Sequence, residues 1–249
     1  MQHWIDVLCE PRELFLAWQP SDAAADRMRW AVGLIRPHGQ DFELRYLKPG
    51  PEFEGLNSGK GFERLQALGY VGYPAFSAHQ SVHREGVRAA LMRRLPPRHR
   101  SDFAEYIKQF RMKPGTPLSD FALLARTEAK LPSDGFSLVD PLDPTTSRCD
   151  LMLEVAGYRH YSPSNHHIKV GTRVELLPEP NNSFDPNAVQ ILVQGQKIGN
   201  INRLQAGTFL HWLRTCKVDA TIERLNGSVD RPRAYIFVRV LPSEVRRAA

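Results

Sequence analysis

The sequence of 249 residues contains only three cysteines, which argues against two structural classes. Cys9, Cys149 and Cys216 lie far apart and form no C-x-x-C pair. Zinc sites and disulfide frameworks need several cysteines at close, recurring spacings. We therefore expect neither a structural zinc site nor disulfides, as is typical of proteins in a reducing compartment.

Long apolar runs are also missing. No uninterrupted apolar stretch approaches the roughly 18 residues that a membrane-spanning helix requires. The first apolar stretch carries Asp6 and Glu10, which is not typical of a signal peptide. We predict a cytoplasmic protein with no membrane partner.

Recognisable catalytic motifs are lacking as well. His79 and His83 have the spacing of a zinc-protease motif, but Gln80 stands where that motif has its glutamate base. The HRD and DFG sequences of protein kinases do not occur. We predict a protein that is not an enzyme and needs no cofactor.

A modest excess of positive charge is present. The chain has 33 basic and 27 acidic residues, a net charge of +6 and a pI near 9.4. Residues 150–249 carry 13 basic and 9 acidic side chains, so most of the excess lies in this part. Phosphate contacts release counterions and so favour basic proteins, but many basic proteins bind other partners.

The order of expected elements predicts an α+β protein with two modules. Apolar runs at 14–18, 29–35 and 42–47 are separated by polar turns, which is typical of short strands. Helical patterns follow from about residue 61, and residues 133–146 are rich in Pro, Asp and Ser. We predict a small β-sheet or barrel with helices over 1–135, a linker over 136–149, and a second module over 150–249.

The second module reads as strands around one helix. Val189, Ile191 and Val193 alternate with polar neighbours, as in a half-buried strand. Asn202 is placed to cap a helix that runs to about Lys217. Asn226-Gly227 predicts a two-residue hairpin turn between strands at 218–225 and 234–240. A small, closed, OB-like β-barrel with a packed helix fits this pattern.

One turn in this module has an unusual composition. Residues 179–189 read Glu-Pro-Asn-Asn-Ser-Phe-Asp-Pro-Asn-Ala-Val between two alternating strands. A first strand ending in Gly157, Arg159 and Tyr161 precedes this turn, and Lys197-Ile198-Gly199 follows it. In this order the motifs resemble the HIRAN domain, over residues 150–241. The resemblance implies a small barrel that grips single-stranded DNA, in the best-studied members at its 3′ end.

The resemblance also implies a set of DNA-binding residues. Arg159 would hold a phosphate; the alternative is a surface arginine that pairs with Glu175 or Glu179. Phe184 would stack on a base or cover the core. Asp185 would accept a hydrogen bond from a 3′ hydroxyl, cap the amide of Asn187 in an Asx turn, or do both. The full predicted set is Arg159, His160, Tyr161, Phe184, Asp185, Asn187, Lys197, Asn200 and Arg203.

Three of these positions are open to other interpretations. His160 stands where several family members have tyrosine; it can stack, donate to a phosphate, or be an ordinary surface or core residue. Asn200 replaces a histidine of some members and can still donate a hydrogen bond. Arg203 matches a basic family position, but next to a helix start it can also be solvated.

The first half carries a second resemblance. Val32-Gly33-Leu34-Ile35, Phe42 to Tyr46, Arg93 to Pro97 and Asp120 to Ala125 resemble segments of the N-terminal subdomain of HipA-type toxin kinases, without the kinase. Nine basic residues lie between Arg84 and Lys113. They can track a DNA backbone, meet a protein partner, or form a solvated face.

Together these features predict a non-catalytic protein that binds single-stranded DNA, its 3′ ends, or DNA at damage and stalled forks. The alternative is a protein-interaction or regulatory module related to toxin–antitoxin kinase scaffolds, with no role on DNA.

Overall fold

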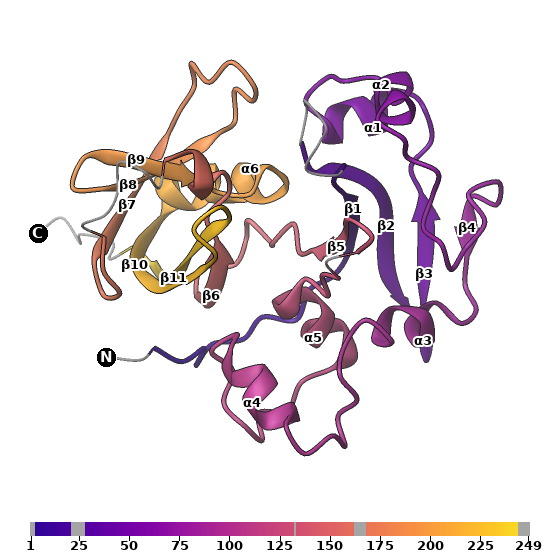
Figure 1. Cartoon of the computed structure of the whole chain (residues 1–249), viewed down its shortest axis with the longest axis horizontal. Helices are drawn as coiled ribbons and strands as arrows, with labels where there is room; N and C mark the ends of the chain where they lie inside the picture. Colours follow the sequence, from indigo (N-terminus) through magenta and orange to yellow (C-terminus); the bar gives the residue numbers. More distant parts are fainter. Residues whose placement is uncertain (1–2, 21–27, 132, 162–167, 244–249) are drawn as a thin grey trace, which may run out of the picture. The chain divides into compact units, whose positions relative to one another are not determined.

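The computed structural model describes residues 3–20, 28–131, 133–161 and 168–243 (Figure 1). They form two compact units. The N-terminal unit comprises Glu10–Tyr106 and Gly115–Pro141, and the C-terminal unit comprises Met1–Cys9, Ile107–Pro114 and Leu142–Ala249. Each unit has one antiparallel sheet, so the predicted α+β class is confirmed. Unlike the predicted modules 1–135 and 150–249, the units are not contiguous stretches of chain.

The sheet of the N-terminal unit has five strands in the order β4-β3-β2-β1-β5. In β3 the buried residues Phe42, Leu44 and Tyr46 alternate with more exposed polar ones, as a half-buried strand requires. Its described strands leave β4 and β5 as edges and form no barrel. The strands are β1 (Leu14–Trp18), β2 (Trp30–His38), β3 (Asp41–Tyr46), β4 (Val82–His83) and β5 (Phe136–Val139). The helices of the first half are α1 (Pro51–Leu56), α2 (Phe62–Ala67), α3 (Val87–Met92), α4 (Phe103–Lys108) and α5 (Asp120–Thr127).

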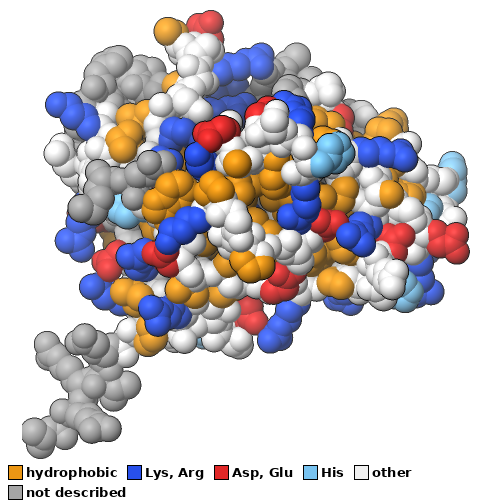
Figure 2. Space-filling model, turned by 90° about the horizontal axis from the view of Figure 1, so that it is seen from below, with side chains coloured by type: hydrophobic (Ala, Val, Ile, Leu, Met, Phe, Trp, Pro, Cys, Tyr) orange, Lys and Arg blue, Asp and Glu red, His pale blue; other side chains and the backbone are white. Residues whose placement is uncertain are grey.

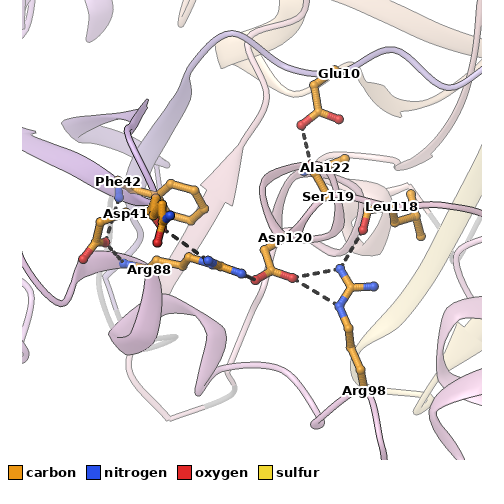
Figure 3. A network of polar contacts seen from close by, with 10 residues as sticks. Glu10, Asp41, Phe42, Arg88, Arg98, Leu118, Ser119, Asp120 and Ala122 are labelled. Atoms are coloured by element: carbon orange, nitrogen blue, oxygen red, sulfur yellow. Dashed lines mark hydrogen bonds and ion pairs between the residues drawn. The ribbon is translucent and has the colours of Figure 1, made fainter.

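Asp120, the first residue of α5, is the centre of a polar network in this unit (Figure 3). Its carboxylate accepts hydrogen bonds from Arg88 Nε and Arg98 Nη2, each at 2.8 Å. Ser119 caps the same helix by accepting from the backbone N–H of Ala122 at 2.8 Å. Burial raises the pKa of Asp120, but hydrogen bonds from the two arginines outweigh it, so the pKa lies below the ordinary value.

We expect Asp120→Asn to lower the free energy of unfolding by about 1 kcal/mol at neutral pH, because two guanidinium groups lose their charged partner. Since the folded-state pKa is lowered, this contribution is present above the unfolded pKa of about 3.9 and is lost as the pH falls through the folded pKa. Chemical denaturation over a pH series measures it, with the exposed acid Glu85→Gln as control. A difference in the free energy of unfolding between wild type and Asp120→Asn that stays constant down to the lowest pH would contradict this account.

The C-terminal unit contains a six-stranded sheet in the order β6-β11-β10-β7-β8-β9. Helix α6 (Arg203–Thr215) buries Ala206, Phe209 and Trp212 against the core of this sheet. Asn202 accepts from the backbone N–H of Leu204 at 3.2 Å, which confirms the predicted cap. The strands are β6 (Cys149–Glu154), β7 (Arg173–Pro178), β8 (Val189–Val193), β9 (Gln196–Asn200), β10 (Cys216–Gly227) and β11 (Pro232–Pro242). None of the described helices is long and apolar enough to cross a membrane.

The described strands of this sheet do not close into the predicted barrel, because β6 and β9 are its edges. One isolated antiparallel bridge links these edges, between Ala156 and Asn200. Each residue donates its backbone N–H to the carbonyl oxygen of the other at 2.9 Å. The bridge therefore brings the chain that follows β6 against the end of β9.

The predicted two-residue turn at Asn226-Gly227 is wrong. Both residues belong to β10, and Gly227 pairs with Pro232 at the end of the ladder. The turn lies in Ser228–Arg231, where Arg231 donates its backbone N–H to the carbonyl of Ser228 at 3.1 Å. Gly227 has a φ of 95°, and a Cβ there would lie 2.2 Å from the carbonyl oxygen of Arg231, so the glycine allows close pairing at the strand end.

Two segments from the first half pack on the outer side of β10 and β11. Ile5 donates its backbone N–H to the carbonyl of Arg111 at 2.8 Å, and His3 stacks on Phe237 with ring centroids 4.9 Å apart. The Glu223 side chain is only 1% exposed; its carboxylate lies 2.6 Å from both His3 Nδ1 and Arg111 Nε. These segments thus supply the partners of a buried carboxylate and are part of this unit.

We expect Arg111→Met to destabilise the C-terminal unit by about 3–5 kcal/mol, because removing one partner leaves the buried Glu223 carboxylate undercompensated. Lys113→Met is the matched control, since its ion pair with Asp6 is more than half exposed on both sides and should matter little. Hydrogen exchange of the backbone amides that pair β10 with β11, both in the C-terminal unit, compares the stability of the two variants. Equal effects of the two substitutions would contradict the role given to Glu223.

Candidate nucleic-acid interface

The turn between β7 and β8 is organised by its own polar side chains. Asn182 Oδ1 accepts the backbone N–H groups of Phe184 at 2.9 Å and Asp185 at 3.2 Å. Asp185 Oδ1 accepts the backbone N–H of Asn187 at 2.9 Å, which confirms the Asx turn. The described residues donate no hydrogen bond to the second oxygen, Asp185 Oδ2. One oxygen of this carboxylate therefore shapes the turn, and the other remains an acceptor.

Phe184 does not cover the core. Its exposed fraction is 79%, in contrast to the buried core residues Val189 and Ile191 of the strand that follows. Three side-chain hydrogen bonds hold the backbone of the turn around it, so the turn presents this side chain outward from a defined backbone position. An aromatic ring held in this way offers a face on which a base can stack.

Glu179 links this turn to β9. Lys197 Nζ lies 2.6 Å and 2.7 Å from its two carboxylate oxygens. The side-chain amides of Asn182 and Asn200 donate to Oε2 at 2.8 Å and 2.9 Å. Burial raises the pKa of Glu179, but hydrogen bonds from Lys197, Asn200 and Asn182 lower it more, so the pKa lies below the ordinary value. The group that shapes the turn is thus an ionised carboxylate at neutral pH.

The segment that precedes the turn in the motif is a helical turn and not the end of a strand. β6 ends at Glu154, and Tyr158–His160 form a 3₁₀ turn, η1, after Gly157 at φ 77°. Tyr158 is buried and anchors this turn, whereas Arg159 and His160 are more accessible, with Arg159 Nε 3.4 Å from His160 Nε2. The Ala156–Asn200 bridge brings this turn to β9.

Lys197 connects the segment at η1 with the β7–β8 turn. Its ammonium group lies 5.7 Å from the centroid of the Tyr161 ring, within the range of a cation–π contact. Because the same ammonium group binds Glu179, it contacts both the aromatic residue after η1 and the carboxylate at the start of the turn. Eight of the nine predicted residues thus lie on η1 or directly after it, on the turn, and on β9, which these contacts join.

Comparison with known proteins assigns this part of the chain to a domain family. A family model described as the HIRAN domain matches residues 150–241. Residues 150–241 form a HIRAN domain. The crystal structure of the HIRAN domain of human HLTF is similar at 19% sequence identity and a TM-score of 0.32, covering 38% of this chain and 77% of that chain. No curated protein matches the chain.

Arg203 on α6 is the remaining member of the predicted set in this HIRAN domain, and Asn187 acts in the turn through its backbone. Arg203 is the first residue of α6, directly after the capping residue Asn202. Asn187 contributes its backbone N–H to the Asx turn of Asp185. Among the described residues, no group of His, Cys, Asp and Glu side chains is arranged to hold a metal ion.

Glu179 and Asn182 organise the site but are not among the residues predicted from the sequence. Both belong to the quoted turn motif, but Glu179 was considered only as a partner of Arg159 or as part of the turn. In the structure it pairs with Lys197, 18 positions away in the sequence. A carboxylate in the turn before β8 and a lysine in β9, the strand that follows β8, are the signal that could have indicated this pair.

The basic stretch between Arg84 and Lys113 is mostly neutralised within the units. On the face in Figure 2, basic and acidic side chains are interspersed. Seven of the nine basic residues form ion pairs with carboxylates, so the stretch is not a continuous positive surface. These pairs are Arg84–Glu43, Arg88–Asp120, Arg94–Asp134, Arg98–Asp120, Arg100–Asp102, Arg111–Glu223 and Lys113–Asp6.

The close contact at the bridge depends on Gly199. Its φ is 151°, and a Cβ there would lie 2.5 Å from the carbonyl oxygen of Ala156. We expect Gly199→Ala to cost about 1–3 kcal/mol of stability from the backbone conformation alone, and more from the clash. Gly195→Ala is the matched control, because Gly195 has φ 77° but open space around the added Cβ.

Hydrogen exchange of the backbone amides of Ala156 and Asn200 reports the bridge directly. Both amides should exchange much faster in Gly199→Ala than in Gly195→Ala. Equal protection in the two variants would show that the bridge does not require this glycine.

Proposed function

We propose that this chain binds single-stranded DNA without catalysing a reaction, and that its HIRAN domain receives the 3′ end of the strand. The observation that carries the proposal is the arrangement of the β7–β8 turn. There, the exposed Phe184 is followed in the chain by the largely buried Asp185, whose carboxylate has one oxygen that accepts no hydrogen bond from the described residues. Flat apolar surface and a hydrogen-bond acceptor are what a terminal nucleoside with a free hydroxyl requires.

Each part of the interface would have a separate role. Phe184 would stack on the last base, a contact worth about 1–3 kcal/mol per base in single-strand binders. Asp185 Oδ2 would accept a hydrogen bond from the 3′ hydroxyl. Arg159 would contact a backbone phosphate further from the end, because a guanidinium group matches phosphate geometry. A carboxylate repels phosphate, so Asp185 fits a terminal hydroxyl better than an internal phosphodiester.

The DNA to which this activity would apply is DNA with accessible 3′ ends, as at damage or stalled forks. The alternative, a protein-interaction module without a DNA role, would use the basic stretch between Arg84 and Lys113. Because seven of its nine cations already pair with carboxylates, the contacts within the chain favour the HIRAN interface over this stretch.

We expect Phe184→Ala to weaken binding by about 5- to 100-fold, corresponding to the loss of one stacked base. Asp185→Asn keeps an oxygen for the Asn187 amide but removes the charged acceptor. It should weaken binding of a strand ending in a 3′ hydroxyl by about tenfold, as expected for one charge-assisted hydrogen bond. The affinity for a strand that ends in a 2′,3′-dideoxynucleotide, which lacks the 3′ hydroxyl, should be nearly unchanged.

Fluorescence anisotropy of the whole chain with short labelled single strands, over a salt series, measures these effects. Val170→Ala is the control for Phe184, because it removes an exposed apolar side chain from another loop. No binding at low salt would refute the proposed function and favour a protein partner. Equal affinity for strands that end in a 3′ hydroxyl and in a 2′,3′-dideoxynucleotide would mean that the chain binds single strands without recognising the end.

A further inference from the structure

We infer that Glu179 is a specificity-determining residue that keeps the interface closed to strands ending in a 3′ phosphate. By holding Lys197 in an ion pair, it withdraws the cation that a terminal phosphate would otherwise bind. The inference rests on the proposed function, since it concerns which DNA end the same site accepts. It assigns Glu179 a role in selection, in addition to its structural bonds.

The geometry of the pair supports this role. Lys197 Nζ is within 2.7 Å of both carboxylate oxygens of Glu179, so its charge is balanced by a group that contacts it directly. The side chains of Lys197 and Glu179 are only 21% and 24% exposed, so solvent and salt screen the pair less than a surface pair. Two amide donors, from Asn182 and Asn200, hold the carboxylate in this position.

The net charge of the groups around the turn also disfavours a terminal phosphate. Glu179 is connected through Asn182 to the backbone of Asp185, so two carboxylates and one ammonium group belong to this part of the interface. These three groups sum to one negative charge; Arg159, which would contact a phosphate further from the end, is not among them. A terminal phosphate monoester carries a charge of about −1.5 to −2 at neutral pH, whereas a hydroxyl carries none. Together, Glu179, Asp185 and Lys197 therefore repel a terminal phosphate and do not repel a terminal hydroxyl.

Glu179→Gln tests the inference, because glutamine keeps the size of the side chain and an oxygen that accepts from the asparagine amides. It removes the charge and leaves the Lys197 ammonium group available to a phosphate. We expect the variant to bind a single strand with a 3′ phosphate about tenfold more tightly than the wild type does, a change of about 1.4 kcal/mol. Affinity for the 3′ hydroxyl strand should not increase.

Two controls separate selection from general effects. Glu175→Gln removes the same charge from an exposed position on the adjacent strand β7 and should not change the ratio of the two affinities. Adding Lys197→Met to Glu179→Gln should abolish the gain for the phosphate end, because the released cation is then absent. Both are measured by anisotropy on the whole chain with the same two strands.

The outcomes distinguish this inference from the proposed function. An equal loss of affinity for both ends in Glu179→Gln would mean that Glu179 is only structural, and an unchanged ratio would also overturn the inference. Failure of the wild type to bind the hydroxyl strand at all would refute the proposed function itself. A gain for the phosphate end that persists in the double variant would rule out Lys197 as its source and overturn the mechanism.

Discussion

The interface depends on one carboxylate and the donors that surround it. Glu179 receives four hydrogen bonds, two from Lys197 and one each from Asn182 and Asn200. Asn182 in turn holds the backbone of the turn that carries Phe184, so the backbone position of this exposed residue depends on a carboxylate five residues earlier. A buried or half-buried charge is stable only when it is paired and hydrogen-bonded, and here its partners come from the turn and from β9. The need to compensate this carboxylate therefore connects the two elements of the proposed site.

A second constraint is that the sheet of the HIRAN domain has edges and an outer face that must be covered. The single bridge between Ala156 and Asn200 connects the two edges where the interface lies. On the outer face, residues 3–9 and 107–114 cover β10 and β11 and neutralise Glu223. In this chain the folding unit is therefore larger than the matched residues 150–241, and the first half contributes directly to its stability.

Local signals in the sequence predicted a good part of this structure. The HIRAN boundaries, the cap at Asn202 and the Asx turn of Asp185 were predicted because each depends on neighbouring residues or on a quoted motif. The turn after β10 was mispredicted, since the Asn-Gly signal lies inside a strand whose pairing extends to Pro232. The Glu179–Lys197 pair and the burial of Glu223 could not be predicted, because both depend on strand register or on segments more than 100 residues apart. The role of the N-terminal half stays a prediction.

The most direct test of the central claim is a crystal structure of the whole chain with a short single strand that ends in a 3′ hydroxyl. The account predicts the terminal base against the Phe184 ring and the 3′ oxygen within hydrogen-bond distance of Asp185 Oδ2, with the Glu179–Lys197 pair intact. DNA bound along the stretch between Arg84 and Lys113, with the β7–β8 turn free of contacts, would contradict it.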